Sequence, residues 1–302
     1  MPLFTPSPTS ERLFGPAFRA YLTSINAIAD AVAADEYVFI PTEVFAAVAE
    51  RGSVTPGEAG KIFWIETLQR AQLAAILTLG RTAGWVEGAR REYDAGALAP
   101  FTACVRALVE ATGDSCHTLN AVAVTLAENA VGIRRELSGS GVGATSTELE
   151  DLLIHFTHAR KVPKGEEAPA SHNAESTIAY IRTLKAMGLP QAEEFYKALC
   201  ERMHPAAAGL AHYYVPSEHG FRISFDQDRP AMDAFVGEYE ASMHDLLSLA
   251  FNPALLTLRV CGAFGIGTSP EALRRIDFSP VALWARVDAG LRAAGLPASC
   301  YT

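Results

Sequence analysis

Apolar residues recur at helical spacing along most of this chain. Thr55-Pro56-Gly57-Glu58 is followed by apolar and amide residues that repeat with a period near 3.6 between positions 62 and 77. Threonine with glutamate three residues later forms a capping box, and proline is favoured at the first helical position. The pattern predicts a helix from about residue 56 to about Leu79.

The clearest amphipathic stripe lies later in the chain. At 100° per residue its members fall within an arc of about 120°, which is typical of a face that packs on a core. They are Met232, Phe235, Val236, Tyr239, Met243, Leu246, Leu247 and Ala250. Thr147, with Glu150 three residues on, predicts a helix over 148–160. Further helices are predicted at 10–34, 41–51, 98–137, 173–187, 191–204 and 281–294, with other starts at Ser269-Pro270 and Ser279-Pro280.

Strand signals are confined to residues 212–225. His212-Tyr213-Tyr214-Val215 and 221–225 flank the turn-forming segment 216–220, which predicts a β-hairpin with a five-residue loop. We therefore expect an all-α protein, a single multi-helix, bundle-like domain over 1–302, with at most one small β-hairpin near 212–225. Glycine and serine at 138–146, and charge with proline at 161–171, predict two flexible loops.

Composition narrows the class of protein. The 302 residues are 49% hydrophobic and 20% charged, which is enough apolar material for a large core and excludes a disordered chain. The net charge of -9 disfavours nucleic acid as a partner.

Compartment is predicted from what the sequence lacks. No run reaches about 18 uncharged apolar residues, so we expect no membrane span. The first eight residues have no basic segment typical of a secretory signal. The five cysteines include no Cys-x-x-Cys pair, which favours reduced thiols and a cytoplasmic protein.

One set of residues has metal-ligand spacing. Asp151, His155 and His158 share an arc of about 60° opposite the apolar stripe of the helix at 148–160. The alternative is a solvated polar face, which needs no metal. We favour no metal and predict no cofactor.

A second set of candidates surrounds the end of the helix at 191–204. Tyr196, Leu199, Cys200 and Met203 form its predicted buried stripe, and His204 precedes Pro205, where the helix should end. His204, His212 and Tyr213 are the candidates for lining a ligand pocket. The alternative is that His204 only interacts with the helix dipole.

Two short motifs have weaker functional interpretations. Gly139-x-Gly141-x-Gly143 suggests a phosphate-binding loop, but nucleotide fingerprints need a preceding strand, and here a helix precedes. A plain linker is the alternative. His244-Asp245 matches the metal-binding pair of HD phosphohydrolases, against an ordinary amphipathic helix.

The run Tyr196-x-x-Leu199-Cys200-x-x-x-His204-Pro205-x-x-x-Gly209 resembles a segment of all-helical bacterial proteins, some of them HEPN-like. In HEPN ribonucleases an arginine precedes a histidine by five to seven positions, and the two act on the RNA phosphodiester across a dimer. Here Arg202 lies only two residues before His204, so the resemblance implies a helical fold without the matching catalytic spacing.

These patterns favour a binding or assembly protein whose partner is a small apolar ligand or another subunit. Self-association into a homo-oligomer is expected because apolar residues are abundant. The rival class is a hydrolase, either metal-dependent and HD-like or a HEPN-like ribonuclease.

Overall fold

A computed structural model describes residues 7–41, 43–44, 47, 50–52, 54–204, 207–267 and 270–296, with the backbone alone at 157 and 208. Several predictions from the sequence fall partly or wholly outside these residues. They concern the start of the chain, the helix at 41–51, Pro205, Ser269-Pro270 and Cys300.

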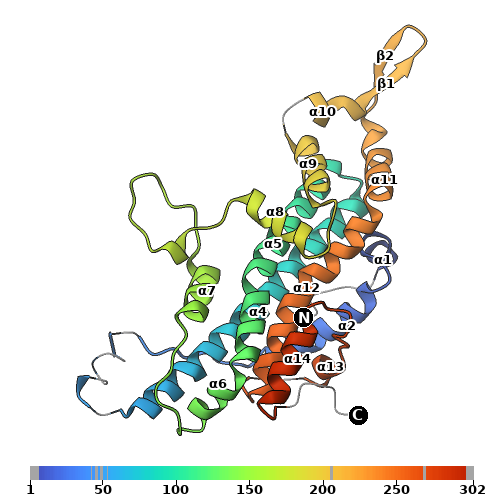
Figure 1. The fold of residues 1–302 in the computed structure, drawn as a ribbon. Helices are drawn as coiled ribbons and strands as arrows, with labels where there is room; N and C mark the ends of the chain where they lie inside the picture. The colour runs from blue at the N-terminus through green and yellow to red at the C-terminus, as the bar shows by residue number, and fades with distance from the viewer. Residues whose placement is uncertain are drawn as a thin grey trace. The chain divides into compact units, whose positions relative to one another are not determined.

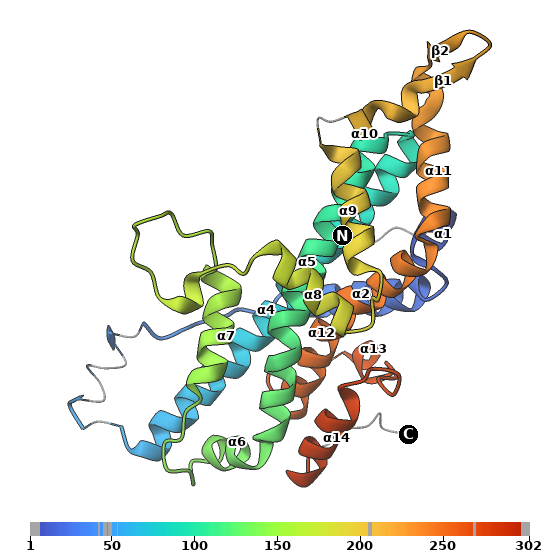
Figure 2. The same ribbon diagram turned by 45° about the horizontal axis from the view of Figure 1, so that its top comes forward.

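The all-α class is confirmed. Figures 1 and 2 show long helices with one short hairpin. The helices are α1 Pro8–Phe14, α2 Phe18–Val32, α4 Pro56–Ala95, α5 Leu98–Glu128, α6 Ala130–Leu137, α7 Thr147–His158, α8 Thr177–Ala186, α9 Ala192–Met203, α10 Ala207–Leu210, α11 Asp228–Glu238, α12 Glu240–Ala263, α13 Glu271–Arg274 and α14 Trp284–Ala293. The strands are β1 Tyr214–Ser217 and β2 Gly220–Ile223, and short 3-10 turns lie at Ala170–His172, Ala211–Tyr213 and Phe225–Gln227.

The start of α4 was predicted correctly, but its end was not. The capping box at Thr55 is confirmed, because its amide donates to Glu58 Oε2 at 2.8 Å. The predicted end of α4 near Leu79 is wrong, since the helix continues to Ala95. Its added turns bury Val86 and Tyr93, and this packing outweighs the glycines that the segment contains.

Three other boundaries differ from the prediction. The cap of α7 is Ser146 and not Thr147, because the Ser146 hydroxyl accepts from the Leu149 amide. The predicted helix 10–34 is divided at Gly15, whose φ of +79° ends α1. The predicted helix 98–137 is divided at Asn129 into α5 and α6.

The chain divides into two compact units. The first contains Met1–Asn26, Leu79–His117 and Glu175–Phe251, and the second contains Ala27–Thr78, Thr118–Ala174 and Asn252–Thr302. The divisions fall inside α2, α4, α5 and α12. A single folding domain stays a prediction.

The core of the first unit is aromatic. Phe235 of α11 lies between Phe101 of α5 and Phe195 of α9, with ring centroids 6.4 and 5.9 Å away. Tyr93 of α4 continues the cluster against Phe101 at 5.6 Å. Buried aromatic pairs of this kind add specific geometry to apolar burial.

The core of the second unit is mainly aliphatic. Buried side chains from α4, α5, α7, α12 and α14 include Leu68, Leu119, Leu153, Leu255 and Leu291. α12 is long and apolar enough by composition to cross a membrane, but 72% of its most apolar window is buried in the protein. Such burial is typical of a core helix in a soluble protein.

Candidate functional site

The structure places two of the three pocket candidates together. His212 Nε2 lies 2.9 Å from Asp228 Oδ1, and the rings of His212 and Tyr213 have centroids 3.9 Å apart. The Tyr213 hydroxyl bonds to the same carboxylate, which raises its pKa. Asp228 also accepts from the Leu98 amide at 3.3 Å. This arrangement fastens the hairpin base to the starts of α5 and α11.

His204 occupies a different environment. It is the exposed C-terminal cap residue of α9, and its amide donates to Cys200 O at 2.9 Å. The described contacts of His212 and Tyr213 do not include it. The geometry therefore agrees with a helix-ending role at this position.

The predicted buried stripe of α9 is confirmed at Leu199 and wrong at its other three positions. Phe195 and Leu199 are fully buried, whereas Tyr196 and Cys200 are half-buried and Met203 is exposed. Phe195 takes the inward position because it stacks on Phe235. The hydroxyl of Tyr196 instead donates to Glu110 Oε1 at 2.5 Å, which gives the polar end of this half-buried side chain a hydrogen-bond partner.

The metal-ligand set on α7 does not assemble. Asp151 and His158 are exposed, whereas His155 is only 8% exposed. The alternative to a metal site, a polar face in contact with solvent, therefore holds for Asp151 and His158 but not for His155. His158 stacks on His172 with ring centroids 5.3 Å apart. Among the described residues no three His, Cys, Asp or Glu side chains lie close enough together to hold a metal ion.

The glycine-rich loop after α6 does bind an anion, and that anion is a carboxylate of the protein itself. Glu136 is 3% exposed and accepts from the amides of Val142, Gly143 and Ala144 at 3.0, 3.2 and 3.1 Å. Successive amides that point at one acceptor form an anion-binding nest. We call Glu136 with residues 142–144 the Glu136 cradle.

Electrostatics of the Glu136 cradle favour the ionised carboxylate. Burial desolvates the group and by itself would raise its pKa. The three amides and the nearby charge of Arg135 outweigh that effect, so the pKa lies below its ordinary value. The cradle is therefore an anion-binding site that is occupied by a carboxylate of the protein itself.

Glycine is required around this carboxylate. A Cβ at Gly60 of α4 or at Gly141 of the loop would lie 2.1 Å from Glu136 Oε2. Trp64, one turn after Gly60, donates from Nε1 to Ala144 O at 2.9 Å. These contacts hold residues 141–144 against the first turns of α4, so part of the predicted flexible loop follows a defined path.

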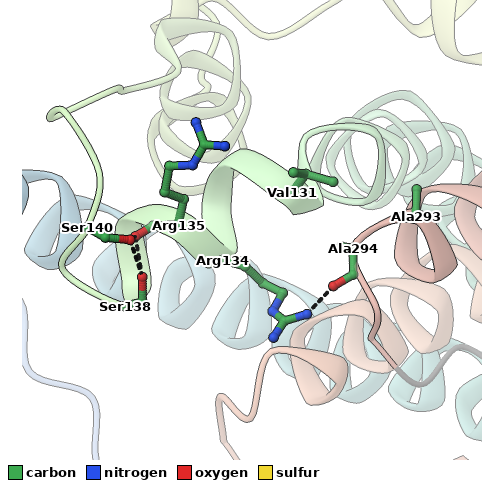
Figure 3. A pocket seen from close by; sticks show the side chains of 7 residues that line it. All are labelled: Val131, Arg134, Arg135, Ser138, Ser140, Ala293 and Ala294. Atoms are coloured by element: carbon green, nitrogen blue, oxygen red, sulfur yellow. Dashed lines mark hydrogen bonds between the residues drawn. The ribbon is translucent and has the colours of Figure 1, made fainter.

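A pocket of about 340 Å³ lies between α6 and α14 (Figure 3). Its lining residues are Val131, Arg134, Arg135, Ser138, Ser140, Ala293 and Ala294. Small-molecule pockets are usually lined mainly by apolar side chains with a few polar groups. Four of the seven lining residues are arginine or serine, so this pocket offers limited apolar surface to a ligand.

The polar groups of this pocket do not converge on a point. Arg134 donates to Ala294 O, while Arg135 points away from it (Figure 3). Ser138 Oγ and Ser140 Oγ both lie within bonding distance of Arg135 O, at 2.7 and 3.3 Å. A phosphate clamp needs donors aimed at one anion, and these side chains are arranged otherwise.

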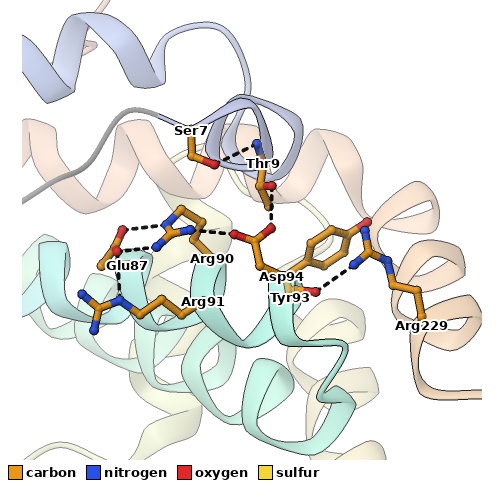
Figure 4. A network of polar contacts seen from close by, with 8 residues as sticks. All are labelled: Ser7, Thr9, Glu87, Arg90, Arg91, Tyr93, Asp94 and Arg229. Atoms are coloured by element: carbon orange, nitrogen blue, oxygen red, sulfur yellow. Dashed lines mark hydrogen bonds and ion pairs between the residues drawn. The ribbon is translucent and has the colours of Figure 1, made fainter.

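A polar network joins α1 and α4 in the first unit (Figure 4). Arg90 contacts both oxygens of Glu87, at 2.9 and 2.7 Å, and Asp94 Oδ2 at 2.6 Å. Asp94 in turn accepts from the Thr9 hydroxyl at 2.7 Å. The hydrogen bond to Arg90 is the main cause of the lowered pKa of Glu87. Every charge in this chain of contacts has an opposite partner, which is typical of a structural network.

Tyr93 extends the polar contacts to α11. Its hydroxyl donates to Asp233, and that carboxylate also pairs with Arg12 at 3.1 Å and Arg229 at 3.4 Å. Burial raises the pKa of Tyr93, and the hydrogen bond to Asp233 adds to the rise. The guanidinium of Arg229 lies 4.2 Å from the Tyr93 ring centroid, a cation–π contact.

The hairpin exposes a continuous apolar face. β1 and β2 pair antiparallel, with Tyr214 opposite Ile223 and Pro216 opposite Phe221. Residues opposite each other share a face, and alternate residues along a strand do so as well. Tyr214, Phe221 and Ile223 are 50%, 75% and 57% exposed. We call Tyr214, Pro216, Phe221 and Ile223 the hairpin face.

The neighbouring segment enlarges this exposed surface. Phe225, two residues after the end of β2, is 79% exposed, although its ring contacts Tyr213 with centroids 5.6 Å apart. The turn is shorter than predicted, because Ser217 pairs with Gly220 and leaves only Glu218 and His219 between the strands. The sequence signal that was missed is the alternation of apolar residues. They occur at every second position, at Tyr214 and Pro216 before the turn and at Phe221 and Ile223 after it, so a short turn places all four on one face of the hairpin.

Comparisons with protein-family profiles, with curated proteins and with solved structures found no match to this chain.

Proposed function

We propose that this protein is a helical assembly protein that binds another protein subunit through the hairpin face. The observation that carries the proposal is the exposure of Phe221, Ile223 and Tyr214 on one side of a small sheet. Contiguous exposed apolar surface on a soluble protein marks an interaction site. The four described free thiols, Cys104, Cys116, Cys200 and Cys261, support assigning this function to the cytoplasm.

The rival functions gain less support. The pocket between α6 and α14 is lined largely by arginine and serine, which offer limited apolar surface to a ligand. The histidines that a hydrolase would use occupy separate contacts, with His158 on His172 and His212 on Asp228. A subunit partner remains the class that the described surface fits best.

Light scattering after size-exclusion chromatography tests the proposal. We expect a mass above the 32.3 kDa of one chain that rises with concentration. Loading should run from about 5 to about 500 micromolar, which covers the weak affinities typical of small interfaces. A mass of one chain throughout this range would overturn self-association as the form of assembly.

A double variant, Phe221→Ser with Ile223→Thr, should raise the dissociation constant about a hundredfold or more. Burial of each apolar side chain contributes about 1.5–3 kcal/mol, and 1.4 kcal/mol corresponds to tenfold. Arg222→Thr is the matched control, because Arg222 lies on the opposite face of the same strand. Equal weakening by the control would contradict an interface on the hairpin face.

A further inference from the structure

We propose that β2 pairs edge to edge with β2 of a second copy of this chain, in an antiparallel pair centred on Phe221. This inference rests on the proposed function and specifies its partner and its geometry. It follows from the direction of backbone groups, the position of a proline and the charges around the hairpin.

Backbone groups of Phe221 and Ile223 point away from β1. In an antiparallel pair, residues alternate between those that bond to the partner strand and those whose groups point outward. Ser224 N–H donates to Tyr213 O at 3.1 Å, which sets the alternation. Arg222 therefore bonds inward, and the amides and carbonyls of Phe221 and Ile223 lie on the outer edge.

The two edges of the hairpin are unequal. On β1 the corresponding outward positions are Tyr214 and Pro216, and proline has no N–H to donate. All four residues of β2 are exposed, and in the described part of the chain no other strand pairs with them. β2 is thus the edge that can accept another strand.

A second copy supplies what this edge requires. The edge needs an extended strand with outward amides and carbonyls and with apolar side chains at alternate positions. β2 itself has this pattern at Phe221 and Ile223, and the hairpin face contains no charge that would meet its like. Around it, Glu218 and Asp226 outnumber Arg222, a balance that disfavours an anionic membrane surface as the occupant.

The register follows by elimination among the outward residues. Pairing centred on Arg222 would set two guanidinium groups opposite each other, which is unfavourable. Pairing centred on Ile223 would set Arg222 opposite Ser224, which lies outside β2, and Phe221 opposite Phe225 in a 3-10 turn. Pairing centred on Phe221 needs only residues of β2, because it sets the two Phe221 rings opposite each other and Gly220 opposite Arg222, and it ends before Ile223, whose counterpart His219 lies in the hairpin turn. It also brings Glu218 diagonally near Arg222 of the second copy.

Amide hydrogen exchange measured by NMR on the full chain tests the edge. Between dilute and concentrated samples, exchange of the Phe221 amide should slow at least about tenfold as association hides it from water. The Arg222 amide, already bonded to β1, should change little and is the internal control. Association with unchanged exchange at Phe221 would overturn edge pairing while leaving the proposed function standing. A single-chain mass at all concentrations would overturn both.

A proline substitution tests the same bond independently. Phe221→Pro removes the outward N–H of the central pair without touching a bond inside the hairpin, and Phe221→Ala removes a similar apolar area but keeps the N–H. We expect the proline variant to dissociate at least about tenfold more readily than the alanine variant. Equal affinities would overturn the edge contact, and an unchanged Tyr213–Ser224 amide bond by NMR shows that the hairpin is intact.

Cross-linking tests the register. In the pairing centred on Phe221, Phe221→Cys places two thiols on directly opposite residues, where Cβ atoms are about 4.5–5.5 Å apart. Ile223→Cys places them farther apart, so it should form less covalent dimer under mild oxidation. The unsubstituted chain, with half-exposed Cys104 and Cys200, gives the background. More dimer from Ile223→Cys than from Phe221→Cys would overturn the register.

Discussion

Each of the two units contains a carboxylate that accepts several hydrogen bonds, but the donors differ between the two. In the second unit, Glu136 accepts backbone amides that lie only 6 to 8 residues along the chain. In the first unit, Asp233 is held by side chains, those of Tyr93 at 140 and Arg12 at 221 residues' separation. Both carboxyl groups have a lowered pKa. The same electrostatic result is thus reached by local backbone geometry in one unit and by distant side chains in the other.

The difference concerns what each arrangement demands of the sequence. The Glu136 cradle needs small residues, because Gly60 and Gly141 leave the space that the carboxylate occupies. The Asp233 cluster needs particular side chains from three helices, α1, α4 and α11, brought into register by the aromatic core. Substitutions in the Glu136 cradle and around Asp233 should therefore lower the stability of the protein by different amounts.

The largest effect is expected for Glu136→Ala. Three amides lose their acceptor, and an unsatisfied buried donor costs about 1–3 kcal/mol, less where water can enter as it can near exposed Val142. We expect the free energy of unfolding in urea to fall by about 2–4 kcal/mol. Glu128→Ala is the control: its exposed ion pair with Arg286 should be worth about 1 kcal/mol or less. Equal losses of unfolding free energy in Glu136→Ala and Glu128→Ala would contradict a difference between the buried cradle and an exposed ion pair.

Two glycine-to-alanine substitutions in α4 should change the stability of the protein in opposite directions. Gly60→Ala places a Cβ against the Glu136 carboxylate, and overpacking of this kind costs about 1–3 kcal/mol. Gly84→Ala, in the same helix with nothing within 4 Å of its Cβ, should stabilise the protein by about 0.5–1 kcal/mol through helix propensity. Thermal unfolding of both variants measures the contrast. Stabilisation by Gly60→Ala would contradict the tight cradle.

Tyr93→Phe tests the cluster in the first unit. It removes a hydroxyl that donates to ionised Asp233 but keeps the ring between Phe101 and the Arg229 guanidinium. Because Arg12 and Arg229 still pair with the carboxylate, we expect a loss of about 1.5–2 kcal/mol in urea unfolding. Tyr214→Phe, at an exposed hydroxyl, should change stability by less than about 0.5 kcal/mol.

The smallest effect is a pH dependence common to both carboxylates. A lowered pKa in the folded state stabilises the protein above the unfolded pKa, about 4, and this stability is lost as pH falls through the folded pKa. The stability difference between the wild type and Glu136→Gln should therefore narrow below about pH 4, by about 1.4 kcal/mol per unit of pKa lowering. Asp233→Asn should change in the same direction but by less, because the Asp233 side chain is 39% exposed and solvent screens its charge. A difference that widens on acidification would contradict the assignment.

Helical periodicity was sufficient to predict the class of fold, because apolar stripes and capping residues act locally. It did not fix which face of α9 turns inward, since Phe195 and Tyr196 are both aromatic and only contact with Phe235 decides between them. The end of α4 was also decided by packing, because the turns beyond Leu79 bury Val86 and Tyr93.

The candidate sites were less predictable. The spacing of Gly139, Gly141 and Gly143 was interpreted as a plain linker in preference to a phosphate-binding loop, so the sequence did not predict that residues 142–144 bind the Glu136 carboxylate. Asp233 and Tyr93 carry no local signal, because their contact depends on how α4 and α11 pack. His212 and Tyr213 were grouped correctly through their adjacency, whereas the contact with Asp228 required the fold.

Pro216 also limits the number of copies that could join through the edges of the hairpin. A sheet with two open edges would let each copy recruit another on either side, and the chain of contacts would lengthen into a fibre. In the proposed pair the β1 edge is closed by a residue that cannot donate, so addition of a second copy uses up the open edge of the hairpin. The hairpin can then present an open strand edge without promoting filament growth, because the proposed association is complete at two copies.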